Sequence, residues 1–130
     1  MNGVLSMISS MYYTDIPEWM TAESLGHSKY WELTEEDYLN MFRESPTYKP
    51  MKVPTLQFLG LKDRRAPARQ GLLYDAMTKK HGTHIDTYVY ESSNHSLADS
   101  VDTSLDIIVK TIMFLERDDW KEEEEKEKKE

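Results

Sequence analysis

The sequence predicts an α/β fold built on about three parallel strands with packing helices. Three short apolar runs, at residues 3–8, 55–59 and 85–90, have the length and the side chains of buried strands. A segment with helical periodicity separates the last two runs, and another follows the third. Strands that alternate with helices pair in parallel through right-handed crossovers, so the three strands are expected to form one sheet.

The first strand and the region after it are the least regular part of the chain. Residues 3–8 carry four apolar side chains in six positions and are predicted to form a short buried strand. Residues 9–33 lack a clean periodicity, are rich in aromatic side chains and contain Pro17, which breaks a helix across their early part. We expect a long surface loop here, with one or two short helical turns near residues 20–25.

Three amphipathic helices are predicted after this loop. Thr34 and Asp37 form a capping-box pattern that starts a short helix, which ends at Ser45-Pro46. Residues 69–81 form the second helix, with Gly82 in the position of a C-terminal cap. Residues 99–118 form the third helix. Its apolar side chains step by four and three, and they are expected to be buried: Val101, Leu105, Ile108, Ile112 and Leu115.

Composition excludes several classes of function. The 130 residues suit one domain or a piece of a larger one. A formal net charge of −8 argues against a nucleic-acid partner, and no apolar run is long enough to span a membrane. Without cysteine or a secretory start, a cytoplasmic location is the default, and no metal or cofactor is expected. Residues 119–130 are expected to be a charged, disordered tail outside a domain at 1–118.

Asp63 and His95 follow the ends of predicted strands, which is where open α/β sheets usually carry their catalytic residues. Asp63 follows the strand at 55–59, and His95 follows the strand at 85–90. If these strands are adjacent and parallel, both side chains lie at the same edge of the sheet, and the carboxylate can fix the tautomer of the imidazole. That arrangement is the acid and the base of a hydrolase triad. The alternative is a turn aspartate and a surface-loop histidine that never meet.

Four short motifs accompany these two side chains. Residues 62–71 read KDRRAPARQG, and residues 93–97 read SNHSL. Earlier in the chain, residues 14–19 read TDIPEW, and residues 44–46 read ESP. Together these motifs resemble the C-terminal catalytic part of acylaminoacyl-peptidases, which are serine peptidases of the prolyl oligopeptidase family. The resemblance covers nearly the whole chain up to about Leu115, with Ala66 where the family usually has valine.

The resemblance implies the C-terminal portion of an α/β-hydrolase fold, with Asp63 as the triad acid and His95 as the triad base. The family's nucleophile lies in a G-x-S-x-G elbow that precedes both residues along the chain. No two of the five glycines bracket a serine in that pattern here. The resemblance therefore implies a fragment, inactive as a peptidase on its own, of an enzyme that releases N-acylated amino acids from peptide substrates. A homo-oligomer is also compatible with the sequence.

Other features leave alternatives open. Arg65 can orient a substrate carbonyl or carboxylate beside the site, since a guanidinium fork suits both, or it can be a solvated loop arginine. The aromatic side chains of residues 9–33, including Trp19 and Trp31, either wall a hydrophobic substrate pocket or form a local packing cluster. For the chain as a whole, the alternative function is a non-catalytic module that binds a partner through an exposed strand edge.

Overall fold

The computed structural model describes residues 3–26, 29–49 and 51–117, so the tail predicted at residues 119–130 lies outside the described residues. In chain order the elements are α1 (Met7–Tyr13), α2 (Pro17–Leu25), the 3₁₀ turn η1 (Tyr30–Glu32), α3 (Glu35–Glu44), β1 (Thr55–Gly60), α4 (Ala68–Lys80), β2 (Ile85–Tyr90) and α5 (Val101–Leu115). None of the helices within the described ranges is long and apolar enough to cross a bilayer.

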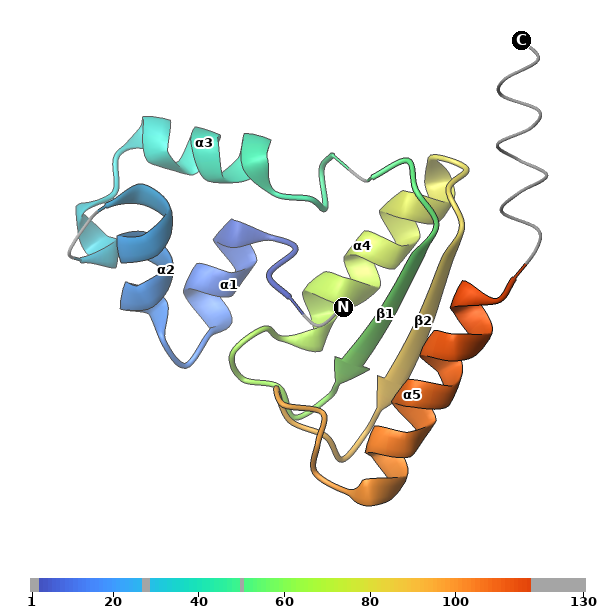
Figure 1. Ribbon diagram of the computed structural model, residues 1–130. Coiled ribbons are helices and arrows are strands. Elements are labelled where there is room, and N and C mark those ends of the chain that lie inside the picture. The colour runs from blue at the N-terminus through green and yellow to red at the C-terminus, as the bar shows by residue number, and fades with distance from the viewer. Residues whose placement is uncertain (1–2, 27–28, 50, 118–130) are drawn as a thin grey trace, which may run out of the picture.

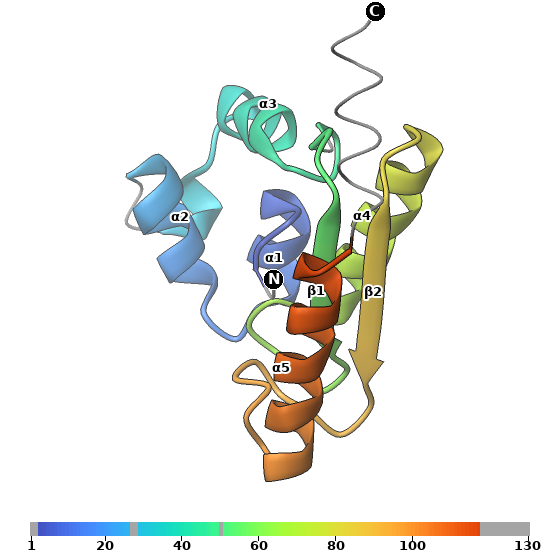
Figure 2. The same cartoon turned by 45° about the vertical axis from the view of Figure 1, so that its right-hand side comes forward.

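The sheet confirms the α/β class. β1 and β2 pair in parallel, in a register that runs from Thr55 opposite Ile85 to Gly60 opposite Tyr90. Two of the three predicted strands are thus present among the described residues. Figures 1 and 2 show α4 on one face of this sheet and α5 on the other, with α1, α2 and α3 grouped beside it. Because both strands end at the same level, the loops that follow them leave the sheet side by side.

The strand predicted at residues 3–8 is wrong. The helix α1 begins at Met7 instead, with Ser6 as its N-cap. The backbone N–H groups of Leu5 and Ser6 donate to Oε1 of Gln70, at 2.9 Å each, rather than to a neighbouring strand. A short apolar run is compatible with a strand and with a buried helical turn. Here the backbone donors of this run bond to Gln70 in the segment of α4, and not to another strand.

The helical turns predicted near residues 20–25 are confirmed as part of α2, but the long loop predicted around them is wrong, because α1, α2 and η1 occupy most of residues 9–33. No helix runs across Pro17, as predicted: α1 ends at Tyr13, and Pro17 is the first residue of α2, a position that needs no amide donor. Gly26 ends α2 in the left-handed conformation, with φ of 74°. These helices are too short to show a clear apolar period. Together with α3 they bury a cluster of three methionines: Met11 on α1, Met20 on α2 and Met41 on α3.

The later helices lie close to their predicted positions. At the start of α3, Asp37 Oδ2 accepts from the Thr34 N–H at 2.8 Å, and Thr34 Oγ1 accepts from the Asp37 N–H at 3.3 Å, which confirms the capping box. α4 is followed by His81 and then by Gly82, which has φ of 78° and so takes the left-handed conformation expected after a helix end.

The burial predicted for the apolar stripe of α5 is wrong. Its five side chains are between 49% and 74% exposed. α5 instead contacts β2 through polar groups: the Tyr90 hydroxyl donates to Asp106 Oδ2 at 2.7 Å, and the Lys110 ammonium lies 4.3 Å from the centre of the Tyr88 ring. The apolar stripe therefore lies at the surface of the part of the chain that the structure describes.

The substitution Gln70→Ala is expected to destabilise the chain strongly. Gln70 Oε1 accepts from the N–H groups of Leu5 and Ser6 and from Ser10 Oγ, and alanine leaves these buried donors without that acceptor. We expect the free energy of unfolding to fall by about 2–5 kcal/mol, measured by urea denaturation. Gln70→Glu keeps an acceptor oxygen in place and is the matched control. Equal losses for the two variants would contradict this role of Gln70.

The contact between α5 and β2 is expected to weaken in acid. Hydrogen bonds from Lys110 and Tyr90 hold the pKa of Asp106 below its usual range. A carboxyl group whose pKa falls on folding stabilises the fold fully above its ordinary pKa of about 4, and this stabilisation is lost as pH falls through the lowered value. The substitution Asp106→Asn removes the ionised carboxylate and with it this stabilisation. The difference in unfolding temperature between wild type and variant should therefore shrink from about pH 7 to about pH 2, and a constant difference would argue against the contact.

Candidate active site

The carboxyl group of Asp63 is fixed by the backbone of its own loop. The Asp63 N–H donates to the carbonyl of Gly60, at the end of β1, over 3.1 Å, and the side chain is fully buried. One carboxyl oxygen, Oδ1, accepts from the N–H groups of Arg65 and Ala66, at 2.8 Å each. These two hydrogen bonds hold the carboxyl group in one orientation, with its second oxygen, Oδ2, toward the next loop.

His95 lies in the loop that follows β2. Asn94 Oδ1 accepts from the Ser96 N–H at 2.9 Å, which closes a tight turn around His95. Leu97 then takes a left-handed backbone conformation, with φ of 55°, while its side chain is buried. This conformation is costly for leucine, so the surrounding structure must hold it, and the Leu97 N–H donates to the Asn94 carbonyl at 3.3 Å.

The two predicted side chains meet. His95 Nδ1 lies 2.9 Å from Asp63 Oδ2. A carboxylate offers only acceptor oxygens, so Nδ1 carries the hydrogen of this bond and Nε2 is the basic nitrogen of the ring. The His95 side chain is 42% exposed and that of Asp63 is 0% exposed, so the pair presents its base to the surface and not its acid. The alternative, in which the two side chains never meet, is excluded.

Gly60 allows the two loops to approach each other. A Cβ atom at this position would lie 2.5 Å from the carbonyl oxygen of Ser93, a backbone atom that cannot turn aside. The same carbonyl accepts from the Lys62 N–H at 3.0 Å, which joins the His95 loop to the Asp63 loop. Any larger residue at the end of β1 would therefore push His95 away from Asp63.

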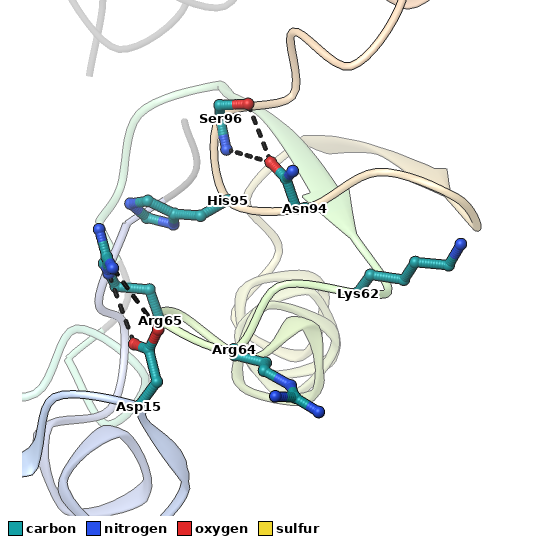
Figure 3. A pocket seen from close by; sticks show the side chains of 7 residues that line it. All are labelled: Asp15, Lys62, Arg64, Arg65, Asn94, His95 and Ser96. Carbon is teal, nitrogen blue, oxygen red and sulfur yellow. Dashed lines mark hydrogen bonds and ion pairs between the residues drawn. The ribbon is translucent and has the colours of Figure 1, made fainter.

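Arg65 lies beside this pair. Its Nε lies 3.4 Å from Asp15 Oδ1, and both side chains are about half exposed, at 51% and 41%. Figure 3 shows the Arg65 side chain turned toward Asp15 and close to His95, whereas Arg64 and Lys62 extend away from the imidazole. Both arginines line a pocket with His95, and Arg65 is the one whose side chain lies beside the imidazole.

Two pockets open beside the imidazole. Both have His95 and Arg65 in their walls, and their volumes are about 410 and 430 Å³. Asp15 lies in the first pocket and Trp19 in the second. The second pocket also has apolar side chains in its walls: Val4, Ile16, Met20 and Ala66. Asp15 is a site residue that the sequence analysis missed, and the only signal for it was its place in the TDIPEW stretch.

No cluster of three or more His, Cys, Asp or Glu side chains could hold a metal ion within the described ranges. His81 Nδ1 lies 2.7 Å from the Met77 carbonyl oxygen, and His84 Nε2 lies 3.0 Å from Asp86 Oδ1. Neither histidine contacts the Asp63–His95 pair through these bonds.

Known proteins are similar to this chain in sequence. The model of the prolyl oligopeptidase family matches residues 1–118. The acylamino-acid-releasing enzyme of Arabidopsis thaliana is 36% identical over 100 residues, which cover 74% of this chain and 13% of that protein. The enzyme of the same name from Mus musculus is 33% identical over 117 residues, which cover 88% of this chain and 16% of that protein.

A solved structure agrees with these relatives. The acylaminoacyl peptidase of Pyrococcus horikoshii superposes with a TM-score of 0.72 at 25% identity, over 89% of this chain and 19% of that one. The chain therefore spans less than one fifth of the length of each of these three proteins. The family match, the sequence identities and the superposition lead to one conclusion: the chain belongs to the prolyl oligopeptidase family and has the fold of part of an α/β-hydrolase.

Proposed function

We propose that this chain supplies the acid and the base of a serine-hydrolase triad, in an enzyme that resembles acylaminoacyl-peptidases. The observation that carries the proposal is the 2.9 Å contact between His95 Nδ1 and Asp63 Oδ2 after two adjacent parallel strands. The names of the relatives, acylamino-acid-releasing enzymes, support removal of N-acylated amino acids from peptides as the reaction. The nucleophile comes from outside these 130 residues, which contain no G-x-S-x-G pattern.

In the proposed mechanism, His95 moves the protons and Asp63 holds His95 in place. His95 Nε2 accepts the proton of the serine hydroxyl as the serine oxygen attacks the scissile carbonyl, and it later gives that proton to the leaving amine. The imidazolium that forms between these steps carries its other proton on Nδ1, directed at Asp63 Oδ2. Since two backbone N–H groups donate to the other carboxyl oxygen, Oδ1, Asp63 stays fixed while the charge on His95 changes.

The pockets beside His95 suggest how a substrate would lie. Ile16, Trp19 and Ala66 offer apolar surface for a substrate side chain next to the scissile bond. We assign Arg65 as a substrate-binding residue on the polar side. Its guanidinium has five N–H donors, so it can donate to a substrate carbonyl or carboxylate while it keeps its contact with Asp15.

A second function is favoured by a different observation. The apolar stripe of α5 is exposed at all five of its positions, from 49% to 74%, and a surface of this kind is typical of an interaction site. A non-catalytic module that binds a partner through this stripe would use the same scaffold without chemistry. The two functions differ in whether Asp63 and His95 contribute to what the protein does.

The chain by itself is expected not to react with a fluorophosphonate probe for active serine hydrolases. Its 130 residues hold no serine in a nucleophile-elbow pattern, and an unactivated serine hydroxyl reacts poorly with such probes. Intact mass after incubation measures the outcome, with an active acylaminoacyl-peptidase labelled in parallel as the control. A probe adduct on the folded chain that disappears when the chain is unfolded before labelling would contradict this expectation.

A graft tests the roles of Asp63 and His95 directly. The full chain replaces the segment that it matches in the Pyrococcus horikoshii acylaminoacyl peptidase, and we expect the graft to hydrolyse an N-acetylated peptide. Asp63→Asn should lower kcat by about 10⁴-fold, and His95→Ala by at least about as much. KM should change little for either variant, because both groups act mainly in the transition state.

His84→Ala is the matched control for His95→Ala in the graft. His84 Nε2 also pairs with an aspartate, Asp86, at 3.0 Å, but it lies just before β2, at the opposite end of the strand from His95. We expect this variant to keep the kcat of the graft within about threefold, well short of the loss that removal of a catalytic base causes. A folded graft that stays active without His95, or that loses as much kcat without His84, would refute the assignment.

A further inference from the structure

Arg65 is held at both of its ends. Its backbone N–H donates to Asp63 Oδ1 at 2.8 Å, so its main chain belongs to the loop of the acid–base pair. Its guanidinium donates to Asp15, with Nε 3.4 Å from Oδ1 and Nη2 3.5 Å from Oδ2. One edge of the guanidinium thus faces both oxygens of one carboxylate, which is the paired arrangement that fixes the orientation of an arginine side chain.

Asp15 is presented to Arg65 by a fixed piece of backbone. It lies between Thr14, which caps the end of α1, and Ile16, which caps the start of α2. The Asp15 N–H donates to the Arg64 carbonyl at 2.9 Å, and the Ile16 N–H donates to Thr14 Oγ1 at 3.3 Å. Exposed ion pairs are usually weak, because two mobile side chains must be ordered. Here the two backbones are bonded one residue away from the pair, so less freedom is lost when the pair forms.

The ion pair decides on which side of His95 the guanidinium lies. Arg65 and His95 are in the walls of both pockets beside the imidazole, whereas Asp15 is in the walls of the polar pocket and Trp19 is in those of the apolar pocket. Figure 3 shows the guanidinium turned toward Asp15 and close to His95. Without Asp15, the guanidinium would be free to turn into the apolar pocket or into solvent. The carboxylate therefore keeps Arg65 on the polar side and leaves the apolar side open.

The charge of Asp15 also affects what Arg65 can bind. A second carboxylate that approached the guanidinium would be repelled by Asp15, whereas a neutral carbonyl would not. The remaining N–H donors of Arg65 are enough to bond such a carbonyl. Lys62 and Arg64, the other cations in the walls of the polar pocket, extend away from the imidazole (Figure 3). The pair of Asp15 and Arg65 thus suits a neutral acceptor next to His95.

We propose that Asp15 is a positioning residue for substrate recognition. It holds the Arg65 guanidinium beside His95, where Arg65 donates to the neutral carbonyl of the N-acyl group, and it disfavours acyl groups that carry a carboxylate. The inference rests on the proposed function, in which Arg65 binds substrate. It narrows that function, because a guanidinium by itself suits a carbonyl and a carboxylate alike.

The charge of the acyl group tests the proposal in the graft. Two peptides are compared that differ only in this group, one N-acetylated and one N-succinylated, which adds a carboxylate. Asp15→Asn keeps the shape of the side chain and removes its charge. We expect KM to rise about fivefold for the acetylated peptide and to fall for the succinylated one, so that the ratio of the two KM values changes by about tenfold. For the acetylated peptide, kcat should stay within about threefold.

A double variant shows whether Asp15 acts through Arg65. Arg65→Gln should raise KM for the acetylated peptide by about tenfold, and Asp15→Asn should raise it no further in that background, because the guanidinium that it positions is gone. Effects of the two substitutions that add, or a ratio of KM values that Asp15→Asn leaves unchanged, would overturn the inference.

Glu36→Gln is the matched control for Asp15→Asn. Glu36 also forms an exposed ion pair with an arginine, Arg43, at 3.2 Å, but it lies on α3 and in the walls of neither pocket beside His95. We expect this variant to keep the wild-type ratio of KM values. The same change of ratio in Glu36→Gln and Asp15→Asn would mean that the overall charge of the chain sets the preference, and it would refute the role of Asp15.

Hydrogen exchange in the isolated chain gives a readout that needs no catalysis. By NMR at about pH 6, the Arg65 Nε–H should exchange with water at least about threefold faster in Asp15→Asn than in wild type, because its bond to Asp15 is lost. The Arg64 Nε–H is the internal reference and should be unaffected. Equal rates for Arg65 in the two chains would overturn the positioning. Faster exchange in Asp15→Asn, together with a wild-type graft that hydrolyses neither peptide, would overturn the proposed triad and leave the positioning in place.

Discussion

The hydrogen bond between Asp63 and His95 depends on one constraint, the parallel pairing of β1 and β2 with Gly60 opposite Tyr90. Both strands end at the same level, so the loop after each begins within reach of the other. The glycine removes the side chain that would hold the loops apart. The two catalytic candidates are 32 residues apart in sequence, yet one crossover through α4 is enough to bring them together. The described chain therefore assembles the pair from its own elements.

The sequence could predict the place of a side chain that comes directly after a strand. It could not predict the place of a side chain that is set by how the helices pack. Asp63 and His95 could be placed because the carboxyl ends of adjacent parallel strands share one edge. Asp15 could not, because it reaches the site through the fold of α1 and α2, where its N–H donates to the Arg64 carbonyl at 2.9 Å. Likewise, the apolar run at residues 3–8 gave no local sign of an acceptor on Gln70, some 65 residues away.

The motif residues divide into two groups by what they contact. Asp63 and His95 contact each other, whereas Gln70 and Ser45 contact the start of α1. Ser45 Oγ accepts from the Met7 N–H at 2.9 Å and donates to the carbonyl of Met41 at 2.6 Å, which ties α1 to the end of α3. A pattern that resembles a catalytic motif thus includes residues that hold the start of α1 against α3 and α4. Their likeness to the family is explained by architecture and not by chemistry.

The helix α5 shows why burial could not be inferred from periodicity alone. Apolar steps of four and three establish that one face is apolar, but they do not establish which surface covers that face. In the described residues, polar contacts of Asp106 and Lys110 join α5 to β2, and the apolar stripe is left exposed. Such a stripe is typical of a surface that binds another segment or another molecule. The contact between Asp63 and His95 does not involve the apolar stripe of α5. The geometry of the pair is therefore independent of whatever covers that stripe.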